Sequence, residues 1–383
     1  MSLAPSWTGG QYSIYRALLA CAVGQQFYER LLREVAGGPE WIALAVTGAG
    51  VLALALGWRD RWASGALLGL LVALEMHRAT RGMGDSDPIP SAHFLCLAFL
   101  LALHLGIPPR PFLSWEARSR PDPAGDWHLP RRLWHLAWIG LAVAQGAILL
   151  VAARPTPGAE PETNALSVVA VGLRLFVVAA AVHPPLRRAA WSSIVLWQIA
   201  WLSAHGWGES HASLWLLHLL AVDPGWLPPR SWRIPSKTLE VGSAVHARLF
   251  YDGECGLCHR SVRFVLAEER ATPESLRLRF APLASQAFET LREHTVDARE
   301  PLPDSIVLQL EDGSLATRST AVLEIASRLG GLWRALSIAG RALPRPALDA
   351  TYDLVARVRG HVFARPSESC PILPPELRDR FES

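Results

Sequence analysis

The sequence predicts a polytopic α-helical membrane domain over residues 1–227, a linker over 228–245, and an α/β domain with a helical C-terminal extension over 246–383. Three observations support this division. A chain of 383 residues is too long for one ordinary hydrophobic core. Half of its residues are hydrophobic, which is high for a soluble protein. Long apolar runs fill residues 41–222, whereas the residues after 246 have the charge balance of a soluble domain.

The N-terminal part consists of apolar runs separated by short polar segments. The runs cover residues 41–58, 62–76, 92–107, 133–153, 166–182, 189–204 and 212–222. Residues 12–28 form either a further short span or an interfacial helix, with Arg16, Gln25 and Gln26 on its polar side. Because a span needs about 20 apolar residues, the pattern predicts roughly seven or eight spans. Tryptophans at the run ends, such as Trp41, Trp58 and Trp62, are typical of the membrane interface.

Arginine distribution predicts the orientation of these spans. If the chain crosses the membrane eight times, most loop arginines fall on the side that also receives the C-terminal domain, among them Arg131, Arg132, Arg187 and Arg188. The positive-inside rule assigns this side to the cytoplasm, so we expect a multi-pass protein of the inner (cytoplasmic) membrane with a cytoplasmic C-terminal domain. The lipid bilayer is then a partner, whereas a net charge of +3 is too small to indicate nucleic acid.

Ionisable and polar residues recur inside the apolar runs, and they are densest at Gln198, His205, Glu209 and His211. One interpretation is a polar loop near the membrane surface with hydrogen bonds between helices. The other is a polar cavity for a quinone, a lipid headgroup or a proton path, because charges at membrane depth are costly without a function. A quinone is the one cofactor that this pattern suggests.

The C-terminal part alternates strands and helices. Strands are expected at 248–251 and 276–280, and a hairpin at 305–310 and 315–317 around Asp312-Gly313, a strong turn signal. Helices are expected at 261–269, 284–293, 320–329, 332–342 and 347–358. This order is that of a thioredoxin-like domain with a C-terminal helical extension.

Two cysteines stand between the first strand and the first helix of this domain, in the sequence Tyr251-Asp252-Gly253-Glu254-Cys255-Gly256-Leu257-Cys258-His259. At the start of a helix, unpaired N–H groups and the helix dipole stabilise a thiolate. The second cysteine is close enough to form a disulfide with the first. Because cytoplasmic thiols are mostly reduced, such a pair is more often catalytic or redox-sensing than structural.

Three other interpretations of the two cysteines stay open. A structural zinc site would need a second pair of ligands, and no second Cys-x-x-Cys follows. Cys255 to His259 also fits the c-type haem attachment pattern, although that chemistry normally follows export from the cytoplasm. The cysteines could also be unreactive core residues. Cys370 is either structural or a third redox thiol.

Residues 246–383 resemble the DCC family of thiol-disulfide oxidoreductases. The resemblance is carried by Tyr251-Asp252-Gly253-x-Cys255-x-x-Cys258, Asp304-Ser305-Ile306, Asp312-Gly313, Arg318-Ser319-x-Ala321, Leu343-Pro344, Asp349-x-x-Tyr352, Ala356-Arg357-x-Arg359, Cys370-Pro371 and Arg380-Phe381. Gly256 and Thr320 depart from the proline and aspartate that the family often has there. The N-terminal part resembles the HTTM domain related to vitamin-K-dependent γ-carboxylase, through its many spans and Tyr15-Arg16.

The motif and the resemblance together suggest a membrane-anchored thiol-disulfide oxidoreductase. Cys255 would attack and Cys258 would resolve, with a thiol or disulfide protein or small molecule as the partner. Supporting roles fall to Asp252, Gly253, His259, Pro303, Arg318 and Ser319, of which Pro303 takes the position where thioredoxin-like folds have a cis-proline facing the dithiol. The alternatives are a redox-sensing module, and a lipid- or peptide-modifying membrane enzyme for which the dithiol domain supplies electrons.

Overall fold

A computed structural model describes residues 6–34, 40–81, 92–152, 165–205, 209–231, 246–269, 272–295, 306–363 and 374–382. Contacts divide the chain into two compact units. The first contains residues 12–116 and 128–223, and the second contains residues 6–11, 117–127 and 224–383. Two segments from the N-terminal half therefore belong to the second unit. The boundaries expected at 227 and 246 stay a prediction, and most of the linker lies outside the described residues.

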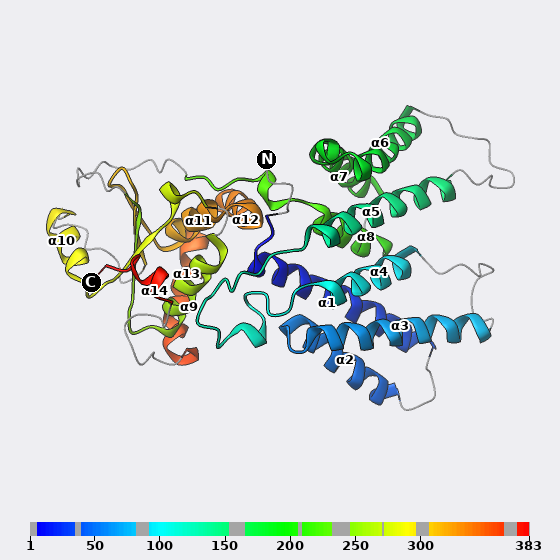
Figure 1. Ribbon diagram of the computed structural model, residues 1–383, viewed down its shortest axis with the longest axis horizontal. Coiled ribbons are helices and arrows are strands. Elements are labelled where there is room, and N and C mark those ends of the chain that lie inside the picture. Colours follow the sequence, from blue (N-terminus) through cyan, green and yellow to red (C-terminus); the bar gives the residue numbers. More distant parts are fainter. Residues whose placement is uncertain are drawn as a thin grey trace. The chain divides into compact units, whose positions relative to one another are not determined.

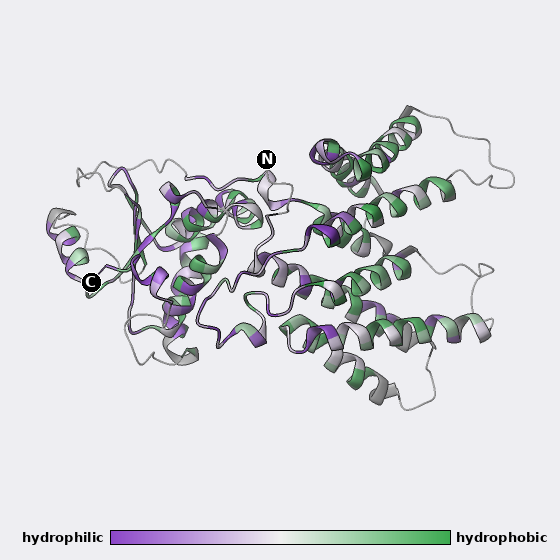
Figure 2. Cartoon of the chain, in the orientation of Figure 1, coloured by the Kyte–Doolittle hydropathy of each residue, from purple (hydrophilic) through white to green (hydrophobic). Residues whose placement is uncertain are grey.

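The first unit is helical, and each expected apolar run corresponds to a helix. The helices are α1 (Gly9–Glu34), α2 (Glu40–Leu56), α3 (Asp60–Arg81), α4 (Ala92–Gly106), α5 (Arg131–Ala152), α6 (Ala165–Val182), α7 (Arg187–His205) and α8 (Glu209–Ala221). Helix α5 packs against α6 and α8, and α3 packs against α2 and α4. Figure 2 shows that α4, α5 and α6 are predominantly hydrophobic.

The polytopic membrane prediction is not confirmed by these helices. Among the described residues, Arg131–Leu150 alone is long and apolar enough to cross a membrane. Shorter apolar helical stretches are Leu44–Leu56, His93–Gly106, Ser167–Val182 and Ala212–Ala221.

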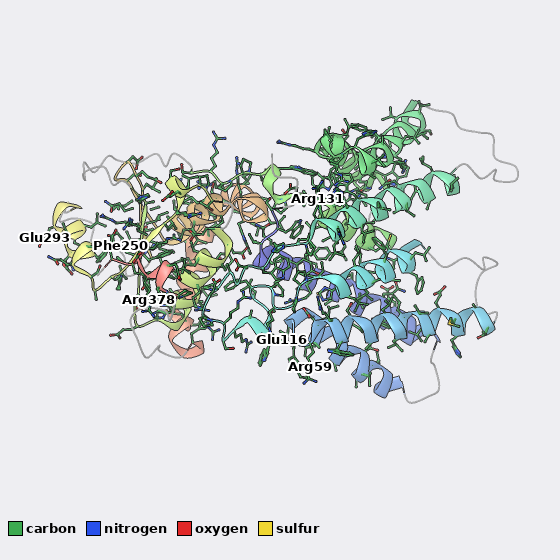
Figure 3. The ribbon with its side chains drawn as sticks, viewed as in Figure 1. Arg59, Glu116, Arg131, Phe250, Glu293 and Arg378 are labelled. Carbon is green, nitrogen blue, oxygen red and sulfur yellow. The ribbon has the colours of Figure 1, made fainter. Side chains whose placement is uncertain are left out.

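Arg16 was expected on the polar side of its helix, and that expectation is wrong. Its side chain is 1% exposed, and Nη1 lies 3.4 Å from Asp60 Oδ2 at the start of α3. Asp60 Oδ2 also lies 3.6 Å from His104 Nε2, and His104 Nδ1 lies 2.6 Å from the Tyr12 hydroxyl. Arg16 is buried because it completes a polar network between helices. Near this network, the backbone N–H of Arg59 donates to Glu116, and both residues are labelled in Figure 3.

The second unit is built on a four-stranded sheet with the order β2-β1-β3-β4. The strands are β1 (Arg248–Tyr251), β2 (Arg279–Pro282), β3 (Val307–Gln309) and β4 (Leu315–Thr317). Strand β1 is parallel to β2 and antiparallel to β3, and β3 and β4 form the expected hairpin. The second strand starts later than expected, because residues 274–276 form a 3₁₀ turn instead.

Helices cover both faces of this sheet, as Figure 1 shows. Helix α10 (Gln286–Thr295) lies on one face, where Phe250, labelled in Figure 3, packs with Phe288 at a ring separation of 5.2 Å. The other face carries α9 (Gly256–Glu268), α11 (Arg318–Leu329), α12 (Gly331–Arg341) and α13 (Arg345–Val362). A short helix, α14 (Pro375–Arg378), precedes Phe381, which forms an isolated bridge with Phe280. Side chains on both faces are buried, which explains why β1 is apolar after its first residue, Arg248.

Candidate dithiol site

The two cysteines lie where β1 passes into α9. A tight turn over residues 252–255 joins β1 to α9. In this turn the Cys255 N–H donates to the Asp252 carbonyl at 3.2 Å, and the Glu254 N–H donates to Asp252 Oδ1 at 2.9 Å. Asp-Gly sequences favour such a turn because the aspartate side chain accepts a hydrogen bond from the backbone two residues further on. The turn therefore holds Cys255 immediately before the first residue of the helix.

Cys255 is the N-cap residue of α9. Its Sγ accepts a hydrogen bond from the Cys258 N–H at 3.4 Å, which replaces the oxygen acceptor that usually caps a helix. Both thiols are free, and Cys255 and Cys258 are 8% and 5% exposed. A thiolate at Cys255 would face a helix N–H and the positive end of the helix dipole, both of which stabilise an anion.

Cys258 has a strongly perturbed thiol. Burial raises its pKa to about 12, with further contributions in the same direction from its hydrogen bond to Cys255, from the charge of Cys255 and from Asp252. The Arg359 guanidinium acts in the opposite direction. Cys258 is therefore held as a neutral thiol while Cys255 is reduced beside it.

Arg359 joins Cys258 and Asp252, although sequence analysis assigned it no role beyond the family resemblance. Its Nη1 lies 4.0 Å from Cys258 Sγ, and its Nη2 lies 3.4 Å from Asp252 Oδ2. Arg359 comes from α13, about 100 residues after the cysteines. The spacing Asp349-x-x-Tyr352 followed by Arg359 was the available signal, because these residues share one face of a helix.

That face of α13 attaches it to the rest of the domain. Asp349 Oδ1 accepts hydrogen bonds from the N–H, at 3.3 Å, and the hydroxyl of Ser319 in the first turn of α11. The N-cap of α11, Thr317, makes no side-chain cap of its own, so Asp349 supplies one from another helix. The Tyr352 hydroxyl accepts from the Ile306 N–H at 3.1 Å, beside the start of β3.

The expected supporting residues divide into two groups. Asp252, Gly253 and His259 surround the dithiol, since His259 Nε2 lies 3.0 Å from the Gly253 carbonyl oxygen. His259 is buried, and its ring and the Tyr251 ring meet edge to face. Arg318 instead pairs with Asp353 on the surface at 3.7 Å, and Ser319 contacts Asp349.

Several expected residues cannot be related to the dithiol. Pro303 and Cys370 lie outside the described residues, as do the side chains of His205, Glu209 and His211. Gln198 is described, and its Nε2 lies 3.0 Å from Nε2 of the fully buried His218. The polar cluster expected in the helical unit therefore stays a prediction.

A cavity of about 610 Å³ opens beside Cys258, on the face of the sheet that carries α9, α11, α12 and α13. Its walls come from β1, α9, α11, α12 and α13, and Leu249 and Tyr251 form part of its base. Cys258 and Arg359 both line it. A thiol and a cation thus stand at the edge of an apolar space of the size that holds small molecules.

Comparison with known protein families matches residues 249–365 to the DCC1-like thiol-disulfide oxidoreductases. The uncharacterized protein YuxK of Bacillus subtilis (strain 168) is 32% identical over 137 residues, which are 35% of this chain and 91% of that protein. The chain belongs to the DCC1-like thiol-disulfide oxidoreductase family. No solved structure matches.

Membership confirms the family resemblance of the C-terminal domain and makes this DCC1-like protein an oxidoreductase. The matched region includes the Cys-x-x-Cys turn and the face of α13 that carries Arg359. It does not include the N-terminal unit, so the HTTM resemblance stays a prediction.

Proposed function

We propose that Cys255 and Cys258 exchange electrons with a thiol or disulfide partner, with Cys255 as the attacking sulfur. The observation that carries this assignment is the N-cap geometry, in which Cys255 Sγ accepts the Cys258 N–H at 3.4 Å. Cys258, held protonated by burial, suits the second step better than the first.

The exchange balances without any further reactant. The Cys255 thiolate attacks one sulfur of the partner disulfide, forms a mixed disulfide and releases the other sulfur as a thiol after it gains a proton. Cys258 then loses its proton, attacks the Cys255 sulfur and releases the second thiol. The protein gives up two electrons and becomes the Cys255–Cys258 disulfide, which an external dithiol reduces again.

Disulfide reduction by the full chain tests this assignment. With bis(2-hydroxyethyl) disulfide as substrate and dithiothreitol as reductant, Cys255→Ser should reduce turnover by at least a hundredfold. Cys258→Ser should stop at a mixed disulfide on Cys255, which mass spectrometry of the intact protein detects. Cys21→Ser is the matched control, because Cys21 is a free, exposed thiol outside the site and its loss should leave turnover unchanged.

Normal turnover in Cys255→Ser would overturn the assignment. Reversible oxidation of the dithiol with no turnover of any disulfide would favour the redox-sensing alternative.

We also propose that residues 1–227 form a multi-span, HTTM-like membrane domain that holds the dithiol domain on the cytoplasmic side. Large apolar side chains on the outside of the helical unit support this proposal, including Val143, Leu150 and Val182 at 65%, 73% and 75% exposure. A reporter enzyme that is active only in the cytoplasm should be active when it is fused after Ser383. Activity confined to an exported reporter would contradict the orientation.

A further inference from the structure

The cavity beside Cys258 has few polar groups to offer a ligand, because the hydroxyl groups of five of its lining residues are hydrogen-bonded within the protein. Ser261 donates to the Leu257 carbonyl at 3.0 Å, Ser337 to the Leu323 carbonyl at 2.7 Å and Thr351 to the Ala347 carbonyl at 2.9 Å. The hydroxyls of Ser319 and Tyr352 are bonded as described above. What the wall presents is therefore largely hydrocarbon.

Apolar side chains make up most of the remaining wall. They include Val262, Phe264, Leu323, Ile325, Trp333 and Leu348. Phe264 and Trp333 meet edge to face with ring centroids 4.8 Å apart, and the Trp333 indole N–H is bonded to Glu268. The indole nitrogen of Trp333 is thus used within the protein, and its ring is the part available to contact a ligand.

The position of Cys258 links this cavity to the exchange reaction. Cys258 must reach the Cys255 sulfur to resolve a mixed disulfide, so the group then attached to Cys255 lies close to Cys258. Cys258 lines the cavity. A volume of about 610 Å³ is within the range of about 300 to 1,000 Å³ that holds small ligands.

We infer that the dithiol acts on a small-molecule disulfide with apolar substituents, and that the hydrocarbon of one substituent binds in the cavity lined by Cys258. This inference rests on the proposed function, because it names the substrate class of the same site. The exchange converts the bound disulfide into two apolar thiols, with electrons supplied by the Cys255 and Cys258 thiols.

Symmetric dialkyl disulfides of increasing chain length test the inference. Their kcat/KM would be measured with the full chain and dithiothreitol, from dipropyl to dihexyl disulfide, with bis(2-hydroxyethyl) disulfide as the polar substrate of the same heavy-atom count as dipropyl. Each methylene of the bound substituent that enters the cavity should raise kcat/KM roughly threefold to fourfold. The readout is the slope of log kcat/KM against chain length.

Two alanines on α13 provide a matched pair of variants. Ala356 lines the cavity, so Ala356→Phe should flatten the slope. Ala350 is exposed on the same helix and does not line the cavity, so Ala350→Phe should keep the slope of the unmodified protein. A general loss of activity, or partition of the substrates into detergent or lipid, affects all variants alike and leaves this comparison intact. Ala326→Leu, from the α11 wall, serves as the second cavity variant if Ala356→Phe does not fold.

The outcomes separate this inference from the proposed function. A flat slope in the unmodified protein, with turnover of the polar disulfide still dependent on Cys255, overturns the inference and retains the dithiol assignment. Turnover of no disulfide, or turnover independent of Cys255, overturns both. Equal slopes in all variants would show that chain-length dependence arises outside this cavity and would also overturn the inference.

Discussion

The Cys258 thiol is kept protonated by its surroundings, and this has consequences for both reactivity and stability. Burial is the main cause, and the neighbouring Cys255 is the next. Folding raises the pKa of Cys258 from the ordinary thiol value of about 8.5 to about 12. Between about pH 8.5 and about pH 12, the folded protein therefore keeps a proton on Cys258 that the unfolded protein has lost. The reduced protein should therefore lose stability as the pH rises through this window.

Replacing Cys255 should make Cys258 more acidic. Cys255→Ser removes a sulfur whose hydrogen bond and charge both raise the pKa of Cys258, so that pKa should fall below about 12, although burial still keeps it above the ordinary value. The rate of alkylation of Cys258 by iodoacetamide, followed against pH, reports the midpoint. Adding Arg359→Ala in the same background should move the midpoint upward again, because the guanidinium stabilises the thiolate. A midpoint near 12 in both variants would contradict this account.

Helix α13 is the element that completes the site. One of its faces caps α11 through Asp349, contacts the chain before β3 through Tyr352, and brings Arg359 to the dithiol. The contacts lie at spacings of three and seven residues, which a helix places on one side. Attachment of this helix and the environment of Cys258 are therefore coupled.

Loss of the Asp349 cap should weaken the attachment of α13 and thereby disturb the environment of Cys258. Asp349→Ala leaves the Ser319 N–H and hydroxyl without their acceptor and should lower the free energy of unfolding by about 1 to 2 kcal/mol. It should also reduce disulfide turnover, because Arg359 is held less firmly. Asp353→Ala is the control, since the Asp353–Arg318 pair is more than 40% exposed and should contribute less than about 0.5 kcal/mol. Denaturation by urea and the turnover assay give the two readouts, and equal behaviour of the variants would refute the coupling.

At the scale of the whole chain, Glu268 attaches the N-terminal segment to the dithiol domain. Its fully buried carboxylate accepts from the Thr8 hydroxyl, from the Gly10 N–H at 2.7 Å and from the Trp333 indole N–H at 2.7 Å. Burial raises the pKa of Glu268, while these hydrogen bonds act against the shift. A side chain at position 10 would collide with the carboxylate, because a Cβ there would lie 2.6 Å from Oε1. The start of α1 is thus capped by a residue more than 250 positions away.

Glu268→Ala should be strongly destabilising. It leaves several buried donors without an acceptor, which should cost roughly 3 kcal/mol in total. Glu289→Ala, on the exposed face of α10, removes a carboxylate whose partner Arg292 is also exposed and should change stability by less than about 0.5 kcal/mol. Urea denaturation followed by tryptophan fluorescence compares the two. Equal midpoints would show that the N-terminal segment is not held by Glu268.

Most helices and strands of the dithiol domain, and its Cys-x-x-Cys motif, could be predicted from the sequence alone. Strand 248–251, the hairpin at Asp312-Gly313 and the Cys-x-x-Cys turn are local features, because turn residues, short apolar runs and helix starts depend on near neighbours. The helices of the N-terminal unit were likewise predictable from their apolar runs, and the number of membrane crossings stays a prediction.

The distant residues that contact the dithiol and each other could not be predicted in this way, because the fold of the whole domain brings them together. Four sets of contacts join segments more than 25 residues apart. They are Arg359 with Cys258, Asp349 with Ser319, Glu268 with Thr8 and Gly10, and Arg16 with Asp60. Such pairs leave no periodic signal, because a buried charge looks like a surface charge until its partner is known. The cavity beside Cys258 has the same origin, since its walls come from elements spread over about 110 residues, and hydrophobic burial is non-directional and does not specify which apolar faces will enclose a space.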